Sequence, residues 1–502
     1  MRRLPLLVIA AALAASACAG SAVLVAGDPA LSPEPANPIL RLVVKAGDDQ
    51  SALPGVTLTF GRDQLTTDGD GVVEIEWRDE PIQFTAAAPG FEATAGNVAL
   101  YPEETGELAV VLAPLVLEGK VVGPDGRALP GTTVALNGRT AVTDGTGSFE
   151  LSRARAGEVT AQRPAWEPGA ATWDGGTPGL VVQLEPRNIK ALRVGGDKAA
   201  DPARWRQLLE LADQSAVNAF VVDTKDESGW VFHESSVPLV EEIGALNVGH
   251  LYDVEQLIAD MDAHGLYKIT RITVFQDNFL ARHSPELGVT DRSTGGVWKN
   301  AKGIRWLDAT DRGAWEYPLA LAEEACQLGF DEIQFDYIRF PSDGDISTVQ
   351  VDGGYTEEVR TATVLAFLEE AHARLNPAGC AVAADIFAVT LTSDWDEGIG
   401  QRPEILSHAV DVLSPMIYTY TYSKGWNGYA DPNEHPVEIV TTALESGIPL
   451  LDGFAIYRPW IQTWQLNAAE ITAVQDVVEE RDLGWMVWSA NTLYDMSFLP
   501  PQ

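Results

Sequence analysis

From residue 187 onward, short apolar segments alternate with amphipathic ones. The apolar segments have the composition of buried strands, and we predict eight: Ala191–Val194, Ala219–Asp223, Lys268–Phe275, Glu332–Phe340, Ala381–Phe387, Val412–Tyr418, Leu450–Tyr457 and Gly484–Trp488. Between them the pattern predicts helices at Asp201–Gln214, Asp253–His264, Trp315–Leu328, Thr361–Leu375, Gln401–His408, His435–Ser446 and Ala468–Arg481. Such alternation is typical of parallel sheets covered by their connecting helices. Eight units of this kind match a (β/α)8 TIM barrel over residues 187–502.

An open, doubly wound sheet is the alternative architecture for the same alternation. Nucleotide-binding sheets of that type carry a Gly-x-Gly-x-x-Gly turn after the first strand, or a phosphate-cradling loop ending in Gly-Lys-Ser/Thr. Neither motif occurs at these places in the chain. The barrel is therefore the favoured prediction.

The segment before the predicted barrel contains an internal repeat. Leu53-Pro54-Gly55 recurs as Leu129-Pro130-Gly131, and the Thr-Asp-Gly turn at 67–71 recurs at 143–147, both with an offset of 76 residues. Short alternating runs separated by Gly/Asp turns are typical of β-sandwiches, because Asp-Gly pairs supply the positive φ that tight hairpins require. We therefore predict a multidomain chain: two small β-sandwich modules, at 38–114 and 115–186, followed by the barrel.

The two modules resemble the carboxypeptidase regulatory-like modules that precede catalytic domains in bacterial extracellular proteins. The resemblance implies a spacer, or weak binding of carbohydrate or protein, and no chemistry.

The N-terminus has the organisation of an export signal. Residues 1–3 form a short basic region through Arg2 and Arg3, an apolar stretch reaches Ala17, and Cys18 follows small residues. The quartet Ala15-Ser16-Ala17-Cys18 resembles a bacterial lipobox. The resemblance predicts a signal peptide over 1–17 and lipidation of Cys18. Plain secretion is the alternative. The Pro-containing segment 18–37 is then a tether.

Charge and cysteine content exclude several classes of function. The chain has 34 Lys+Arg against 72 Asp+Glu, a net charge of −38, which repels nucleic acid and anionic lipid. Three cysteines are too few for a disulfide framework or a four-thiolate zinc site. In an oxidising compartment Cys326 and Cys380 either pair or remain two separately buried thiols, and we favour separate thiols.

Polar and aromatic side chains gather where the predicted strands end, which is where barrel enzymes hold their active sites. The candidates are Asp223, Lys225, Asp226, Arg271, Asp336, Arg339, Asp385, Tyr418, Trp460, Gln462 and Trp488. Paired carboxylates serve glycosidic bond cleavage, in which one protonates the leaving oxygen and the other attacks the sugar or activates water. No strand ends in a Gly-x-Ser-x-Gly elbow, and His-Glu-x-x-His is absent, which disfavours esterases and zinc hydrolases.

Four motifs in order carry a more specific resemblance. They are Asp223-Thr224-Lys225-Asp226, Phe335-Asp336-Tyr337-Ile338-Arg339-Phe340-Pro341, Ser414-Pro415-Met416-Ile417-Tyr418 and Arg458-Pro459-Trp460-Ile461-Gln462. With them, residues 187–495 resemble a glycoside hydrolase family of bacterial exported proteins, whose barrels are similar to the α-amylase-like glycosidases.

The resemblance implies that Asp336 stands where amylase-like enzymes place a nucleophile, and Asp385 near their acid/base. Two positions depart from that pattern: Asp385 replaces the usual Glu, and Gln334 replaces an Arg two residues before the nucleophile. These departures leave the retaining mechanism open. The resemblance implies no cofactor, and no metal site is predicted.

Each candidate also has a purely structural interpretation. Asp336 is then a buried partner of Arg271 or Arg339, and Asp385 caps a strand end. Asp223, Lys225 and Asp226 bind substrate or form a local network that holds their loop. For the remaining candidates, substrate contact competes with packing of the barrel rim; these are Arg339, Tyr418, Trp460, Gln462 and Trp488.

Three functions remain open. The favoured one is an exported, lipid-anchored glycoside hydrolase acting on a poly- or oligosaccharide, a monomer that touches the membrane only through Cys18. The second is a barrel that binds glycan without cleaving it. The third is a surface scaffold with no glycan role. Fold alone does not decide among them.

Overall fold

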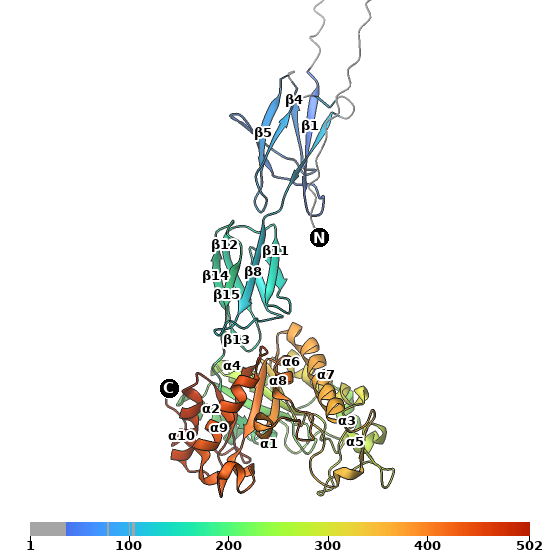
Figure 1. Cartoon of the computed structure of the whole chain (residues 1–502), viewed down its shortest axis with the longest axis vertical. Helices are drawn as coiled ribbons and strands as arrows, with labels where there is room; N and C mark the ends of the chain where they lie inside the picture. The colour runs from blue at the N-terminus through green and yellow to red at the C-terminus, as the bar shows by residue number, and fades with distance from the viewer. Residues whose placement is uncertain (1–36, 78–79, 100, 103–105) are drawn as a thin grey trace, which may run out of the picture. The chain divides into compact units, whose positions relative to one another are not determined.

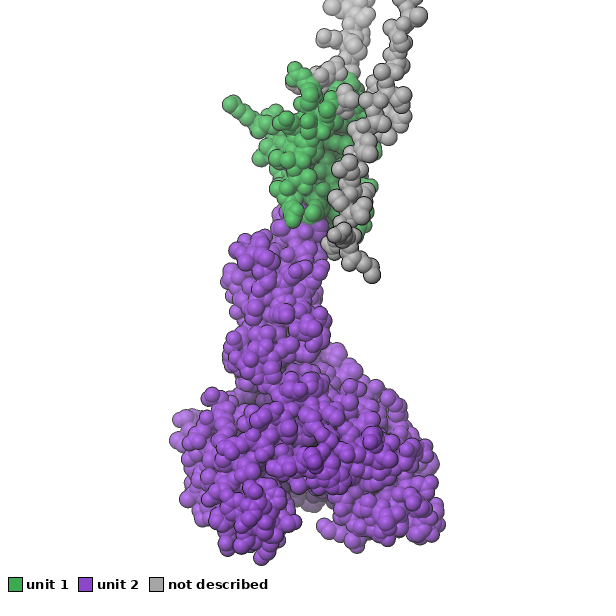
Figure 2. Space-filling view, viewed as in Figure 1, with its two compact units in different colours: residues 1–88, 92–113 green, residues 89–91, 114–502 purple. Residues whose placement is uncertain are grey.

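The computed structural model describes residues 37–77, 80–99, 101–102 and 106–502. The chain forms two compact units, residues 1–88 with 92–113 and residues 89–91 with 114–502 (Figure 2). The predicted signal peptide, most of the tether and the lipidation site Cys18 lie outside the described residues. Within the described part of the chain, no helix has the length and hydropathy needed to cross a bilayer.

The first unit is built from two sheets. One has the strand order β4-β1-β7 and the other β3-β2-β5-β6. Buried and exposed residues alternate along β1, as the sequence predicts. The strands are β1 (Ile39–Ala46), β2 (Thr57–Phe60), β3 (Asp63–Thr66), β4 (Val72–Glu76), β5 (Ile82–Ala87), β6 (Thr94–Val98) and β7 (Glu107–Leu112).

The second unit begins with the same arrangement, in sheets β11-β8-β15 and β10-β9-β12-β14 and a small β13-β16 pair. The repeated threonine explains part of the repeated motif: Thr67 Oγ1 donates to the carbonyl of Leu53 at 2.7 Å, and Thr143 Oγ1 to that of Leu129 at 2.6 Å. The strands are β8 (Val116–Val122), β9 (Thr133–Leu136), β10 (Arg139–Val142), β11 (Ser148–Ser152), β12 (Gly157–Gln162), β13 (Trp166–Glu167), β14 (Gly169–Trp173), β15 (Leu180–Gln183) and β16 (Glu185–Pro186).

The rest of the second unit is a closed parallel barrel of eight strands in the described residues, with strand seven in two pieces. The strands are β17 (Lys190–Val194), β18 (Ala219–Lys225), β19 (Tyr267–Thr273), β21 (Glu332–Asp336), β23 (Ala381–Phe387), β24 (Val412–Ile417), β25 (Ile456–Tyr457) with β26 (Trp460–Gln462), and β27 (Trp485–Trp488). Pairing of β17 with β27 and of β23 with β24 closes the ring, so the predicted TIM barrel is confirmed and the open sheet is wrong.

Helices follow the first seven strands and surround the barrel (Figure 1). They are α2 (Pro202–Asp213), α4 (Val254–Ala263), α6 (Glu316–Leu328), α7 (Glu357–Leu375), α8 (Pro403–Leu406), α9 (Pro436–Gly447) and α10 (Ala468–Glu479). Each lies within its predicted region, except that α7 starts four residues earlier and α9 ends one residue later. Shorter helices and strands lie in the loops: α1 (Gly196–Ala199), α3 (Pro238–Glu242), α5 (Leu280–His283), β20 (Thr290–Asp291) and β22 (Val349–Gln350).

Two predicted strands differ substantially from the observed ones, and the bounds of the other six agree to within two residues. Strand seven was predicted at Leu450–Tyr457, but pairing starts at Ile456 and continues to Gln462 with a break at Pro459, which has no N–H to donate. Strand four was predicted to reach Phe340, but β21 ends at Asp336 because Tyr337 adopts a left-handed φ of 53°.

A disulfide joins Cys326 on α6 to Cys380, the residue before β23. Our preference for two separate thiols was wrong. Charge and hydropathy do not predict whether the two cysteines pair, because the pairing depends on where the end of α6 meets the start of β23.

Strands β8 to β16 form the β-module of the second unit, which packs against the N-terminal end of the barrel. Ala381, Ala383 and Val412, at the beginnings of two barrel strands, belong to the same hydrophobic cluster as residues of the module. Arg163 of the module also pairs with Asp411 at 2.8 Å, and both side chains are fully buried. The opposite, C-terminal end of the barrel is the one that these contacts leave open.

Candidate active site

Asp336 ends β21 and is held by a neighbouring arginine. Arg271 on β19 donates Nε and Nη2 to Asp336 Oδ2, at 3.0 and 2.6 Å, and the Tyr337 backbone N–H donates to Oδ1 at 2.6 Å. The left-handed Tyr337 residue that ends the strand thus also supplies a hydrogen bond to the carboxyl. Asp336 is 5% exposed. These three donors fix the position of the Asp336 carboxyl.

Arg271 is the centre of a buried charge network. Its Nη1 lies 3.3 Å from Asp223 Oδ1 and 3.4 Å from Glu227 Oε2, and Arg193 pairs with the other oxygen of Asp223. Burial alone would lower the pKa of Arg271, but the charges of Asp336, Asp223 and Glu227 outweigh it and raise the pKa well above its usual value. The guanidinium is therefore permanently charged and fixes the position of Asp336.

Asp385 on β23 has the opposite environment. It is 1% exposed, Trp460 Nε1 donates to its Oδ1 at 2.8 Å, and its buried Oδ2 has no protein partner among the described residues. Burial, followed by the negative charge of Asp336, raises the pKa of Asp385 well above its usual value. Its environment therefore favours the protonated acid.

The two aspartates stand on adjacent strands at the same level. Parallel pairing aligns Phe335 with Ala384, the residues immediately before Asp336 and Asp385. Adjacent strands lie about 4.8 Å apart. The barrel thus brings together a carboxyl paired with an arginine and a carboxyl whose pKa is raised by burial, and acid–base chemistry uses pairs of carboxyls in contrasting environments.

Three comparisons relate this chain to known proteins. A family model described as "Putative glycosyl hydrolase domain" matches residues 191–494, more than half of the chain. The chain belongs to this family. A search of curated protein sequences found no match.

Several solved structures are similar to the family domain. A hypothetical protein from Ruminiclostridium thermocellum is 34% identical, over 39% of this chain and 96% of that one, with a TM-score of 0.36. The PgaB glycoside hydrolase domain from Bordetella bronchiseptica is 13% identical, over 61% and 95%, with a TM-score of 0.44. The PelA glycoside hydrolase domain from Pseudomonas aeruginosa is 11% identical, over 62% and 97%, with a TM-score of 0.37.

Glu227 is a member of the glycosyl hydrolase domain's charge network that the sequence analysis missed. Its side chain is 43% exposed and contacts Arg271. Burial would raise the pKa of Glu227, but Arg271, Arg193 and a backbone hydrogen bond together outweigh burial and lower the pKa, so the ionised carboxylate is favoured. The available signal was its place directly after Asp226, in the loop that follows β18.

Two aromatic candidates lie beside the arginines of the charge network. Trp488 is half-buried, with the guanidinium carbons of Arg193 and Arg271 4.5 and 4.8 Å from its ring centre. Tyr418 packs on Trp488 with ring centres 6.4 Å apart. Trp460 is fully buried inside the barrel, where it holds Asp385 rather than facing the mouth.

Lys225 does not join the site. A bulge separates Asp223 from Lys225, so the lysine points away from the barrel axis, where it is fully buried and pairs with Asp277 at 2.8 Å. Asp226 accepts hydrogen bonds from its own turn, through the N–H groups of Ser228 and Trp230. Burial and neighbouring acids raise the pKa of Asp226 to about 6.

The side chains of Gln462 and Arg339 are also engaged in contacts with other residues of the protein. The Gln462 amide accepts from the Tyr420 N–H and donates to Asn433 and to the Trp464 carbonyl. Arg339 is buried among three aromatic rings, with its guanidinium 4.5 to 5.1 Å from their centres. Gln334, at the position of the amylase-like arginine, points into the barrel and donates to Ser414 at 3.3 Å.

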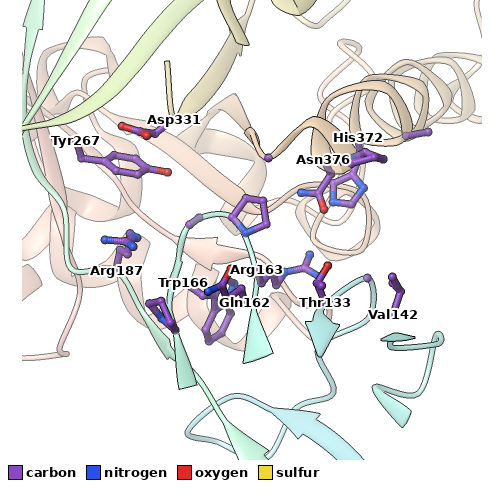
Figure 3. Close-up of a pocket in the computed structure, with 17 residues that line it drawn as sticks. Thr133, Val142, Gln162, Arg163, Trp166, Arg187, Tyr267, Asp331, His372 and Asn376 are labelled. Carbon is purple, nitrogen blue, oxygen red and sulfur yellow. The ribbon is translucent and has the colours of Figure 1, made fainter. Parts of the chain in front are cut away.

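Two cavities bear on where a ligand enters. One of about 390 Å³ lies beside Tyr418 at the C-terminal end of the strands. A larger one, about 670 Å³, lies at the opposite end, between the barrel and the β-module, where Trp166, Arg187 and Tyr267 line it (Figure 3). The larger cavity is remote from the carboxyl pair, because Tyr267 begins β19 and Asp336 ends the neighbouring β21.

Within the described residues, no cluster of three or more metal-ligating side chains occurs.

Proposed function

We propose that the barrel hydrolyses glycosidic bonds, with Asp385 as the acid and Asp336 as the ionised carboxylate. The observation that carries this proposal is the contrast between their environments: three donors hold Asp336, whereas Oδ2 of Asp385 is buried without a protein partner. In glycosidases, two carboxyls with such divided protonation flank the bond that breaks.

The first step forms a covalent intermediate. Asp336 attacks the anomeric carbon, the bond from that carbon to the bridging oxygen breaks, and the oxygen takes the proton of Asp385. Asp385, now ionised, then accepts a proton from a water molecule, which attacks the anomeric carbon and releases Asp336. We favour this double displacement because Asp336 and Asp385 hold neighbouring positions on adjacent strands, whose backbones lie about 4.8 Å apart, and retaining enzymes need the short carboxyl separation of about 5–5.5 Å.

Glu227 is the other carboxyl at the mouth, and its environment suits a different task. Since Arg271 keeps Glu227 ionised, this side chain has no proton to donate to a leaving group. It is positioned to accept hydrogen bonds from sugar hydroxyls. Asp223 is enclosed by Arg193 and Arg271, so it positions those arginines.

The reaction is tested by release of reducing ends from a panel of bacterial and plant polysaccharides. The full exported chain is compared with Asp336→Asn and with Asp343→Asn, an exposed aspartate in the loop after the same strand. We expect release by the wild type and by Asp343→Asn, and a loss of at least about a hundredfold in Asp336→Asn. Equal release by all three would remove Asp336 from the mechanism. Glycan binding without release by any of them would favour the non-catalytic barrel.

The location of the protein is a separate part of the proposal. The Ala15-Ser16-Ala17-Cys18 quartet supports export followed by lipidation of Cys18, with the β-modules as a spacer between membrane and barrel. Fractionation and mass spectrometry of the N-terminal peptide test this in a bacterial host. We expect a diacylglyceryl cysteine in the membrane fraction and a soluble protein from Cys18→Ala. An unmodified N-terminus in the wild type would contradict it.

A further inference from the structure

The mouth of the barrel has a charged half and an uncharged half. Arg193, Asp223, Glu227, Arg271 and Asp336 all belong to β17, β18, β19, β21 and the loop after β18. The cavity of about 390 Å³ lies instead over β23, β24 and the segments that follow them. Its described lining residues include no charged side chain: Phe387, Ala388, Val389, Met416, Tyr418, Thr421, Tyr422, Ser423 and Trp426.

Asp385 stands at the boundary between the two halves. Phe387, which lines the cavity, follows Asp385 by two residues on β23 and therefore faces the same side of the strand. Register pairs Phe387 with Met416 on β24, the next strand around the barrel. Because β23 lies between β21 and β24, the cavity begins beside Asp385 on the side away from Asp336.

We propose that this cavity is the leaving-group subsite and takes a neutral sugar residue, which places a C–H face against Trp426 and Tyr422. The inference rests on the proposed function, in which Asp385 protonates the bridging oxygen. An acid in contact with that oxygen lies between the sugar attacked by Asp336 and the sugar that leaves. The leaving sugar therefore extends beyond Asp385, into the uncharged half.

The chemistry of the lining defines the class of sugar. Tyr422 and Trp426 form a T-shaped pair with ring centres 4.7 Å apart, and both are half-buried, so each offers part of its surface. Exposed Thr421 and Ser423 place hydroxyls at the rim. A carboxylate, sulfate or ammonium on the sugar would lose water here without gaining a charged partner among the described lining residues. The volume lies within the range of small-molecule sites, about 300–1,000 Å³.

Binding is measured first, in the full chain carrying Asp336→Asn so that probes stay intact. The probes are neutral hexasaccharides (cellohexaose, chitohexaose, mannohexaose) and charged ones (hexagalacturonate, fully deacetylated chitohexaose). Trp426→Ala is compared with Tyr420→Ala, an aromatic residue of the same loop that is 54% exposed and outside the cavity lining. We expect a neutral probe to bind, with Kd raised about tenfold or more by Trp426→Ala, little changed by Tyr420→Ala, and partly restored by Trp426→Phe. Tighter binding of the charged probes, no binding of any neutral one, or no effect of Trp426→Ala would overturn the proposal.

Kinetics separate this inference from the proposed function. With otherwise wild-type protein, Trp426→Ala is expected to reduce kcat/KM about tenfold for an oligosaccharide. It is expected to leave a glycosyl fluoride unaffected, because fluoride is too small to occupy the cavity. Equal loss on both substrates, or on neither, would overturn the leaving-group assignment while hydrolysis stands. Trp426-dependent binding with no hydrolysis of any substrate would overturn the proposed function and the leaving-group role, and would leave a neutral-sugar site.

Discussion

The indole Nε1–H of Trp460 donates to Oδ1 of Asp385 at 2.8 Å, while Oδ2 of that carboxyl has no described protein partner. The hydrogen bond favours the anion, but burial and the charge of Asp336 oppose it and prevail, so the pKa of Asp385 is raised. This balance connects the fold to the reaction, because Trp460 belongs to the second half of a strand that Pro459 interrupts.

The first prediction concerns pH. If Asp385 is the acid, the alkaline limb of kcat/KM reports its pKa, and activity persists above the range of an ordinary aspartate. Trp460→Phe removes a bond that stabilises the anion, so the pKa rises further and the alkaline limb moves to higher pH. Trp485→Phe is the matched control, since Trp485 donates to Glu479, on α10 outside the barrel. A limb that does not move, or moves downward, would contradict the assignment.

The second prediction concerns Arg271. Arg271→Lys keeps one charge but cannot place two donors on Asp336 Oδ2, and we expect kcat to fall about a hundredfold. Arg271→Ala leaves buried carboxylates without a cation and should lower the free energy of unfolding by about 3–5 kcal/mol. Steady-state kinetics and urea unfolding measure the two effects. Unchanged kcat in Arg271→Lys would show that the two-donor contact has no part in catalysis.

The third prediction concerns the junction of barrel and β-module. Arg163→Ala leaves Asp411 buried without its arginine partner, and we expect the unit to lose about 3–5 kcal/mol of stability. Arg187→Ala, which breaks an exposed pair with Glu167, should cost about 0–1 kcal/mol. Urea unfolding at neutral pH compares the free energies of unfolding of the two variants. Equal, small losses of stability in both would contradict the prediction.

The same pair has a pH dependence with a defined sign. Burial would raise the pKa of Asp411, but the charge of Arg163, the neighbouring His372 and the hydrogen bond from the Val382 N–H together outweigh burial, so the folded-state pKa is lowered. Its stabilisation is therefore fully present above the unfolded-state pKa of about 3.9, and it is lost as the pH falls through the folded-state value. The stability difference between wild type and Arg163→Ala should narrow on acidification.

The fourth prediction concerns the disulfide. Cys326 and Cys380 are 54 residues apart, so their bond restricts the unfolded chain. We expect the double variant Cys326→Ala/Cys380→Ala to be less stable by about 2–4 kcal/mol, with kcat nearly unchanged because the bond lies near the start of β23 and Asp385 further along it. Alkylation of both thiols in the natively exported protein without reductant would contradict the pairing.

Sequence periodicity predicted most of the barrel because apolar strands and amphipathic helices have different repeats. It failed where single residues override the repeat. Tyr337 ends β21 through a left-handed backbone, and Pro459 splits strand seven, neither of which hydropathy detects.

The site was predicted only in part for a related reason. Strand-end position identified Asp336, Asp385 and Arg271, and the structural interpretation of Asp336 as a partner of Arg271 describes a real contact. Orientation was not available from the sequence: the bulge after Asp223 turns Lys225 away from the axis. Glu227 was missed because it lies beyond the strand, in a loop whose path depends on tertiary contacts.

The central claim is the division of roles between Asp385 and Asp336, and leaving-group dependence tests it most directly. Asp385→Asn and Asp336→Asn are assayed in parallel on an oligosaccharide and on a dinitrophenyl glycoside of the same sugar, whose leaving group needs no proton. We predict that Asp385→Asn loses about 10²–10⁴-fold on the oligosaccharide but far less on the dinitrophenyl glycoside, whereas Asp336→Asn loses activity on both. Equal losses of Asp385→Asn on the two substrates, or full activity of Asp336→Asn on either, would contradict the account.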